Sequence, residues 1–394
     1  MNSDLKRSNT KELDSTYIAH TYNRFPVEIV NGKGSIVTDE TGKTYIDLGT
    51  GIAVNTFGLA DEEWQQAVTA QIAKFQHVSN LYYSAPCANL AQVLCERTGM
   101  KKVFFSNSGA EANECAIKVA RKYAAEKKGS EYYHIVTLKN SFHGRTITTL
   151  AATGQDVFHQ DFLPLTDGFL YADPTDAEGL INLVNEYKIA AIMFEAVQGE
   201  GGVLPLPAVF VETMVKLAKE KDILLIADEV QVGNGRSGKL YGYMHYGFTP
   251  DIVSTAKGLG GGLPLGVTML GERVKDIFAP GLNGSTFGGN PVCCSGAISV
   301  LSRLTDEFLE EVTKKAEIIK EALTGADGIE DISGLGLMIG IKTVKDAKEI
   351  ANECLKRGVL VLTAKDKVRL LPPLNIDTEL LKKALEVIKE VCKL

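Results

Sequence analysis

Lys257 has the most distinctive chemical surroundings in this sequence, because it opens a glycine-rich loop directly after an apolar stretch. Residues 254–262 read STAKGLGGG, so alanine and glycine flank the lysine and no charged residue stands beside it. This setting suits a partly buried amine with a lowered pKa. Such an amine can form a Schiff base with an aldehyde. The glycines do not follow the GxxxxGK[ST] order of a nucleotide-binding P-loop.

Two acidic residues, Asp228 and Glu229, close the apolar run at 223–227. A buried carboxylate is costly unless it is paired, so acids at the end of an apolar strand are more informative than acids on a helix surface. Asp228 could hold a cationic ring nitrogen. Glu229 could be no more than a structural hydrogen-bond partner.

Two small-residue segments could bind a phosphate. The first, SNSGAEAN at 106–113, joins a predicted strand to a helix, and the free N–H groups of a helix start attract anions. Its structural alternative is a capping box, with Ser108 as the cap and Glu111 three residues later. The second segment, GSTFGGNP at 284–291, offers hydroxyls that could bind phosphate or only shape a turn.

Each of these signals is weak alone, but together they describe one kind of site. A phosphate cradle, an acid for a pyridinium nitrogen and a Schiff-base lysine are what a protein supplies to pyridoxal 5'-phosphate (PLP). The cofactor itself supplies the electron sink.

Composition excludes several other classes of protein. The 394 residues are 45% hydrophobic and 23% charged, as in ordinary soluble proteins, and the net charge of −7 disfavours nucleic-acid binding. The polar start and the absence of a long apolar run predict neither a secretion signal nor a membrane helix. Seven scattered cysteines without a CxxC pair predict free thiols and no metal site, as expected of a cytoplasmic protein.

Short apolar runs alternate with helical patterns through the middle of the chain. Strands are expected at 103–105, 133–138, 190–197, 223–227, 252–254 and 266–270, and helices at 111–128 and 209–221. One face of the first helix is apolar and comprises Ala112, Cys115, Ala116, Val119, Ala120 and Tyr123. This alternation predicts an α/β fold with a mostly parallel sheet covered by helices.

The two ends of the chain have a different pattern. Short strands are expected at 27–31, 35–38, 44–48, 337–341 and 359–362, and helices at 295–304, at 306–323 and from 378 onward. We therefore expect a large domain at 56–290 and a smaller α+β domain built from both termini, residues 1–55 and 291–394.

The order of motifs resembles the class III (ornithine-type) aminotransferases of fold type I. The resemblance runs from YNRFPV at 22–27 to VRLLPP at 368–373. Between them stand SNSGAEANE at 106–114, SFHGRT at 141–146, EAVQGEGG at 195–202, DEVQVGNGR at 228–236, AKGLGGGLPLG at 256–266 and GSTFGGNP at 284–291. It implies a seven-stranded, mostly parallel sheet in the large domain, PLP as the cofactor and a homodimer with shared active sites.

The resemblance also implies roles for individual residues. Lys257 would carry the cofactor and move the proton, and Asp228 would pair with the pyridine nitrogen. The remaining cofactor contacts would be Ser108, Gly109, Ala110, Phe142, Glu229, Val230, Gln231 and, from the partner subunit, Thr286. Phe142 would stack on the ring, and Gln231 would lie near its phenolic oxygen.

For the substrates, the resemblance implies transfer of the δ-amino group of N2-acetyl-L-ornithine to 2-oxoglutarate. Arg145 and Ser285 would contact the first substrate, and Arg369 would hold a substrate carboxylate with Glu200 as its gate. A guanidinium suits this task because it binds a carboxylate in a bidentate fork.

The sequence departs from the usual family pattern at two places. The family usually has a histidine-containing turn where this chain has Gly58-Leu59-Ala60-Asp61-Glu62-Glu63, and Val232 replaces a common threonine. The turn shapes the substrate entrance or the dimer face.

The resemblance leaves alternative functions open. Within the family these are ornithine, succinylornithine and 4-aminobutyrate aminotransferases and glutamate semialdehyde aminomutase. Outside it, the GxGxxG spacing at 233–238 would suit a dehydrogenase, but it follows an acidic strand end late in the chain. A non-catalytic relative would lack Lys257.

Overall fold

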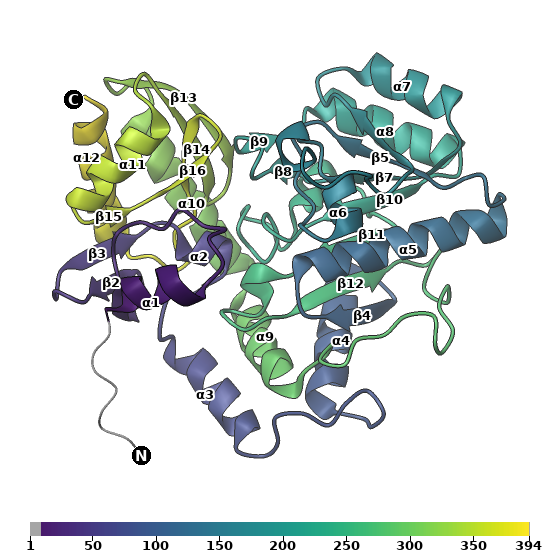
Figure 1. The fold of residues 1–394 in the computed structure, drawn as a ribbon, viewed down its shortest axis with the longest axis horizontal. Coiled ribbons are helices and arrows are strands. Elements are labelled where there is room, and N and C mark those ends of the chain that lie inside the picture. The colour runs from purple at the N-terminus through teal and green to yellow at the C-terminus, as the bar shows by residue number, and fades with distance from the viewer. Residues whose placement is uncertain (1–8, 394) are drawn as a thin grey trace.

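Seven strands form the largest sheet of the computed structural model, which describes residues 9–393 (Figure 1). Their order across the sheet is β4 (Lys102–Ser106), β12 (Gly266–Leu270), β11 (Ile252–Thr255), β10 (Leu224–Asp228), β7 (Ile189–Phe194), β5 (His134–Leu138) and β6 (Phe169–Ala172). Strand β12 runs antiparallel to both of its neighbours, and every other pair in the sheet is parallel. The predicted α/β class with a mostly parallel seven-stranded sheet is confirmed.

Helices cover both faces of this sheet because its central strands are apolar on both sides. Ala191 and Met193 of β7 pack in the hydrophobic cluster that contains the buried side of α5 (Gly109–Lys127). Ile192 and Phe194, which point the other way, share a cluster with α7 (Ala177–Glu186) and α8 (Ala208–Glu220). All six residues predicted for the apolar face of α5 are buried.

Two smaller sheets form the second part of the molecule, on the left in Figure 1. One is β1 (Ile29–Lys33), β2 (Ile36–Asp39), β3 (Thr44–Asp47) and β15 (Val359–Leu360), and the other is β13 (Ile329–Leu335), β14 (Met338–Thr343), β17 (Lys367–Leu370) and β16 (Leu362–Ala364). Helices α10 (Asp306–Leu323), α11 (Ala347–Lys356) and α12 (Thr378–Cys392) accompany them. The parallel pairing of β15 with β3 brings together segments from the two ends of the chain. The domain boundaries at 55 and 290 remain a proposal, and residues 1–8 and 394 lie outside the described residues.

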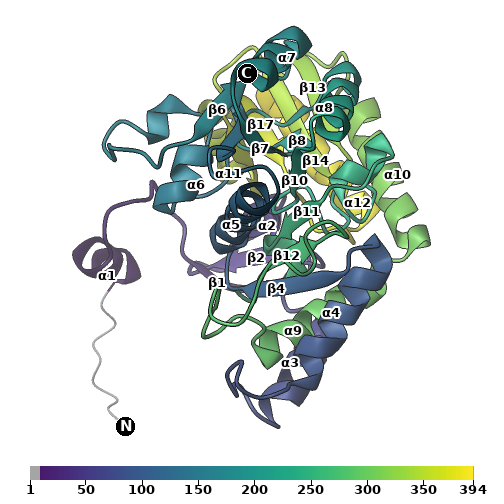
Figure 2. The same cartoon turned by 90° about the vertical axis from the view of Figure 1, so that its right-hand side faces the viewer.

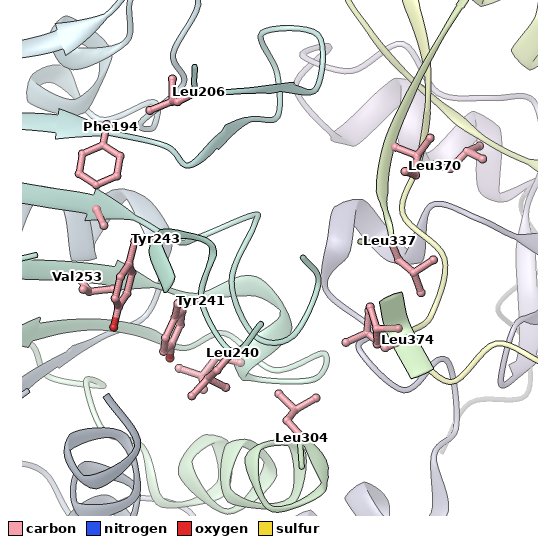
Figure 3. Packing of buried hydrophobic residues seen from close by; sticks show 14 of the residues in the cluster. Phe194, Leu206, Leu240, Tyr241, Tyr243, Val253, Leu304, Leu337, Leu370 and Leu374 are labelled. Carbon is pink, nitrogen blue, oxygen red and sulfur yellow. The ribbon is translucent and has the colours of Figure 1, made fainter. Parts of the chain in front are cut away.

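One hydrophobic cluster joins the two parts of the molecule. Figure 3 shows Phe194, Tyr241 and Tyr243 in the large sheet region, with Leu337, Leu370 and Leu374 on the opposite side and Leu304 near the bottom of the view. All of these side chains are buried. Because the interior is shared, the loops at the junction of the two parts have firm support on both sides.

The first two helices of the chain lie beside the smaller sheets, on the left in Figure 1, and the other remaining elements lie around the large sheet. They are α1 (Thr10–Tyr17), α2 (Thr50–Ala53), α3 (Glu62–Ile72), α4 (Ala85–Thr98), α6 (Ile147–Ala152), α9 (Pro291–Arg303), β8 (Val197–Gln198), β9 (Leu204–Pro205) and the 3-10 turns η1 (Asp156–Phe158), η2 (Gly242–Tyr246) and η3 (Lys257–Leu259). Helices α3 and α4 both pack against α9 (Figure 2). No helix within residues 9–393 has the length and apolar character needed to cross a bilayer.

The structure departs from the predicted elements at two places in the large sheet. The sequence predicts six of its strands individually, and the seventh is the edge strand β6, which is only partly buried. The strand expected at 190–197 ends at Phe194, because the Glu195 carboxylate turns to accept hydrogen bonds from two loops. Val197 and Gln198 form a separate short hairpin strand with β9.

Candidate active site

A cavity of about 680 Å³ lies where several strands of the large sheet end. Its walls include residues that directly follow β4, β7 and β11, the last residue of β10, and the segment 142–145 in the loop after β5. The predicted site residues among them are Ser108, Gly109, Ala110, Phe142, Arg145, Asp228, Val230, Gln231 and Lys257. Ligands of open α/β sheets characteristically bind at the carboxyl ends of the parallel strands.

The start of α5 forms one side of this cavity. Ser108 is the N-cap and its Oγ accepts a hydrogen bond from Glu111 N at 3.2 Å, while Glu111 Oε2 accepts from Asn107 N at 2.7 Å. The cap predicted from the sequence is therefore present, although the carboxylate reaches the residue before Ser108. Within residues 9–393, the N–H groups of Gly109 and Ala110 make no hydrogen bond, as is usual in a first helical turn. They can receive an anion such as a phosphate.

Asp228 is buried at the end of β10 and has three partners. Its Oδ2 lies 2.8 Å from Asn113 Nδ2 and 2.8 Å from His143 Nδ1, and its Oδ1 accepts from Val230 N at 3.0 Å. Asn113 is itself oriented by Ser254, whose Oγ lies 2.5 Å from its Oδ1. The carboxylate is therefore fixed in a wall of the cavity, where it can pair with a cationic nitrogen.

Lys257 follows β11 and lines the same cavity. Burial lowers the pKa of its amine, and the nearby carboxylate of Glu200 only partly opposes this effect. The lowered pKa expected from the sequence is thus confirmed. The backbone of Lys257 has a φ of 44°, a left-handed conformation that is uncommon for residues other than glycine. Strain of this kind is frequent at functional sites.

Glu229 does not line the cavity. Its carboxylate is fully buried and accepts hydrogen bonds from Gly242 N at 2.7 Å and Tyr243 N at 2.8 Å. Burial raises its pKa to about 8. This geometry favours the structural alternative for Glu229 over a direct cofactor contact.

Arg369 and Glu200 form an ion pair next to Gln231. Arg369 Nη1 lies 2.6 Å from Glu200 Oε1 and 3.0 Å from Gln231 Oε1, and Gln231 Nε2 donates to Glu200 Oε1 at 3.2 Å. Burial acts to raise the pKa of Glu200, but Arg369, together with the charge of Lys257 and the hydrogen bond of Gln231, lowers it, and the net shift is downward. Only Gln231 of the three borders the cavity, so the pair lies beside it.

Arg145 differs from Arg369 in lacking a carboxylate partner within residues 9–393. Its guanidinium lies over the ring of Phe158 at 4.0 Å from the centroid, and 5.5 Å from that of Phe142. The side chain is exposed, and it borders the cavity. It can therefore receive a carboxylate without first breaking an ion pair.

Ser285 and Thr286, like Glu229, are predicted site residues that do not line the cavity of their own chain. Ser285 Oγ accepts from Gly288 N at 2.9 Å and from Asn107 Nδ2 at 3.2 Å, so it shapes the turn. Thr286 is exposed, and neither residue lines the cavity.

Three buried polar residues of the site were not predicted individually. Asn113 and His143 hold Asp228, and Glu195 accepts from Phe142 N at 2.9 Å and from Gly199 N at 3.2 Å. Burial raises the pKa of Glu195 to about 7. Glu195 lies inside the strand expected at 190–197, and an acid within an apolar run is a signal that could have identified it, whereas Asn113 and His143 carry no such signal.

The family described as aminotransferase class-III matches residues 17–392, which is nearly the whole chain. This chain belongs to the class-III aminotransferases. It is a PLP-dependent enzyme, and the cofactor predicted from the sequence is confirmed.

Individual class-III aminotransferases resemble the chain over almost its full length. The acetylornithine aminotransferase of Haemophilus ducreyi is 48% identical over 383 residues, which cover 97% of this chain and 98% of that protein. The N-acetylornithine aminotransferase of Stenotrophomonas maltophilia superposes with a TM-score of 0.84 at 32% identity, covering 96% of this chain and 97% of that one. The ornithine aminotransferase of Toxoplasma gondii, in a structure with PLP at partial occupancy, has a TM-score of 0.92 at 29% identity, with 98% and 94% covered.

Proposed function

We propose that this enzyme transfers the δ-amino group of N2-acetyl-L-ornithine to 2-oxoglutarate, giving N-acetyl-L-glutamate 5-semialdehyde and L-glutamate. The proposal extends to arginine biosynthesis in the cytoplasm. The full-length likeness to acetylornithine aminotransferases supports it. The observation that carries it is the unequal state of the two arginines: Glu200 neutralises Arg369, while Arg145 is free to bind a carboxylate.

The chain's residues fit PLP at this cavity. The free N–H groups of Gly109 and Ala110 suit its phosphate, Asp228 its ring nitrogen, Phe142 its ring face and Lys257 its aldehyde. When bound, PLP acts as an electron sink for the carbanion left by proton removal. Asp228 keeps the ring nitrogen protonated, because a nearby anion raises the pKa of a cation. Lys257 moves the proton, and the burial that lowers the pKa of its amine favours the neutral form that can accept one.

Two substrates of different length must use one site in turn. Glutamate has two carboxylates and would engage both Arg145 and Arg369. Acetylornithine reacts at its far amine and has one carboxylate, so the charge of Arg369 would then be surplus. The 2.6 Å contact with Glu200 compensates this buried charge, which would otherwise be costly. The acetyl group removes the α-ammonium charge and leaves a single reactive amine.

A panel of donors tests the substrate assignment. We expect acetylornithine to have a higher kcat/KM than succinylornithine, ornithine and 4-aminobutyrate, with 2-oxoglutarate as the acceptor. In Glu200→Ala, the unmasked Arg369 should favour the glutamate half-reaction and slow the acetylornithine half-reaction by about tenfold, or ~1.4 kcal/mol. Arg145→Ala should weaken both half-reactions. If ornithine or 4-aminobutyrate were preferred by about tenfold, the substrate assignment would be wrong and the cofactor assignment would stand.

We also propose a homodimer in which Thr286 completes the phosphate site of the partner subunit. Its absence from the lining of its own chain's cavity supports this arrangement. The surrounding surface supports it as well, because Phe287 is 60% exposed and Tyr82, on the neighbouring loop, is 72% exposed. A face with large apolar side chains is typical of a protein interface.

Mixing two impaired variants tests the shared site. A Lys257→Ala subunit and a Thr286→Ala subunit should each have low activity alone. In a mixed dimer, one site would contain both substitutions and the other neither. Random exchange should therefore restore about a quarter of wild-type activity, since half of the dimers are mixed and each has one intact site. Absence of recovery, with exchange shown by tagged subunits, would place Thr286 in its own chain's site.

A further inference from the structure

Lys257 lies in a loop whose backbone carbonyls are held by side chains from other parts of the chain. Asn234 Nδ2 donates to Ala256 O at 3.2 Å, Thr56 Oγ1 to Gly258 O at 2.8 Å, and Trp64 Nε1 to Gly260 O at 3.1 Å. The three acceptors alternate along residues 256–260, and Lys257 lies between the first two. We call Thr56, Trp64 and Asn234 the clamp residues.

The loop needs such support because its backbone conformation is strained. Lys257 has a φ of 44°, which costs energy for a residue with a side chain. Its short turn is closed by hydrogen bonds from Leu259 N to Ala256 O at 2.9 Å and from Gly260 N to Lys257 O at 3.1 Å. These 3-10 hydrogen bonds have poor geometry and would not hold the loop in one conformation by themselves. Hydrogen bonds from other segments can stabilise that conformation.

The residues around Trp64 hold its side chain in position. One of them, Asp61, belongs to the Gly58–Glu63 turn, where the sequence departs from the family pattern. Asp61 caps α3 by accepting from Trp64 N at 2.9 Å, and Arg303 of α9 pairs with Asp61 at 2.9 Å. The indole lies so close to Gly261 and Gly296 that a Cβ at either position would be 2.7 or 2.8 Å from Nε1. The ring therefore has little freedom, and its N–H has a fixed direction.

Thr56 and Asn234 are buried, so water does not compete for their bonds. Asn234 Nδ2 also lies 3.0 Å from Thr255 Oγ1 at the end of β11. The loop is thus tied to the loop before α3, to α3 itself and to the segment that follows Asp228.

We propose that Thr56, Trp64 and Asn234 are positioning residues that hold Lys257 in the conformation in which its amine meets the PLP aldehyde. The proposal rests on the role proposed above for Lys257. In this arrangement the turn at Gly58–Glu63 serves the lysine loop through Trp64, and α3 and α9 support it from outside the cavity.

Three single variants separate positioning from general stability. Trp64→Phe keeps an aromatic ring but removes the N–H, and Thr56→Val removes only the hydroxyl. The matched control is Val68→Ala, because Val68 lies one turn along α3 and also packs on Gly296, with no bond to the loop. Each variant is measured for its thermal midpoint, its PLP dissociation constant by absorbance titration, and amide hydrogen exchange of residues 256–263 without PLP.

We expect Trp64→Phe and Thr56→Val each to weaken PLP binding about fivefold, as for loss of one hydrogen bond. Exchange at the amides of Leu259 and Gly260 should accelerate about tenfold in the PLP-free protein. Val68→Ala should lower the thermal midpoint and leave both other quantities unchanged. The inference is overturned if the two clamp variants match wild type in exchange and PLP binding, or if Val68→Ala reproduces their effects.

The outcome also distinguishes this inference from the proposed function. If wild type bound PLP through another lysine, the proposed role of Lys257 would fail, although the exchange data would still report on the loop. If wild type bound PLP through Lys257 and the clamp variants behaved like wild type, only the positioning role would fail.

Discussion

Replacement of Lys257 by alanine is expected to reduce kcat/KM by at least about 10⁴-fold, or more than ~5 kcal/mol of transition-state stabilisation. The lysine both holds the cofactor and moves the proton, so one substitution removes two functions that no neighbour can replace. The fold should survive, because the lysine side chain lines a cavity and forms no ion pair within residues 9–393. Half-reaction rates measured by stopped-flow absorbance check the first point, and circular dichroism checks the second.

Lys315 offers a matched control for this variant. Burial also lowers the pKa of Lys315, but its amine donates to Leu374 O at 3.0 Å and lies away from the cavity. Lys315→Ala should cost some stability and leave the half-reactions near wild type. Normal half-reaction rates in Lys257→Ala would end the assignment of this lysine.

Asp228→Asn is expected to lower kcat about 10²- to 10³-fold, or ~3 to 4 kcal/mol, while PLP binding weakens only modestly. Asparagine keeps the shape but removes the negative charge that holds the ring nitrogen protonated. The substitution should therefore lower kcat much more than it lowers the affinity for PLP. The bonds of Asp228 to Asn113 and His143 should hold the substituted side chain in place.

The control for Asp228→Asn is Asp251→Asn. Asp251 is a largely buried carboxylate with a pKa raised by burial, and it pairs with Arg273 at 3.0 Å outside the cavity. Its substitution should reduce the free energy of unfolding with little change in kcat. Near-wild-type turnover in Asp228→Asn would contradict the role of the charge.

The sequence predicted those parts of the molecule whose signals are local. The apolar face of α5, the helix Asp306–Leu323 and the strand Gly266–Leu270 occur as expected, because each has a clear periodicity or apolar run. The positions of Asp228 and Lys257 at strand ends were also apparent, since charged residues there contrast with their apolar surroundings. The edge strand β6 lacks this contrast, being only partly buried.

The unpredicted parts of the site depend on contacts between distant segments. Asn113 approaches Asp228 only because α5 packs on the sheet, and Trp64 meets Gly260 across 196 positions in the chain. The sequence predicts Glu195 as a strand residue, because the contacts between its carboxylate and the N–H groups of two loops form only when the chain folds. The sequence left open whether Glu229 contacts the cofactor or only stabilises the fold. The hydrogen bonds that its carboxylate accepts from two backbone N–H groups favour the structural role.

The central claim is that Lys257 holds PLP in the cavity at the carboxyl ends of the sheet strands. The most direct test is borohydride reduction of the PLP-loaded wild-type enzyme, followed by proteolysis and mass spectrometry. We predict that an absorbance band near the visible edge disappears and that the added mass of the reduced cofactor is found on Lys257 alone. A reduced cofactor attached to another lysine, or none attached to the chain, would contradict the account.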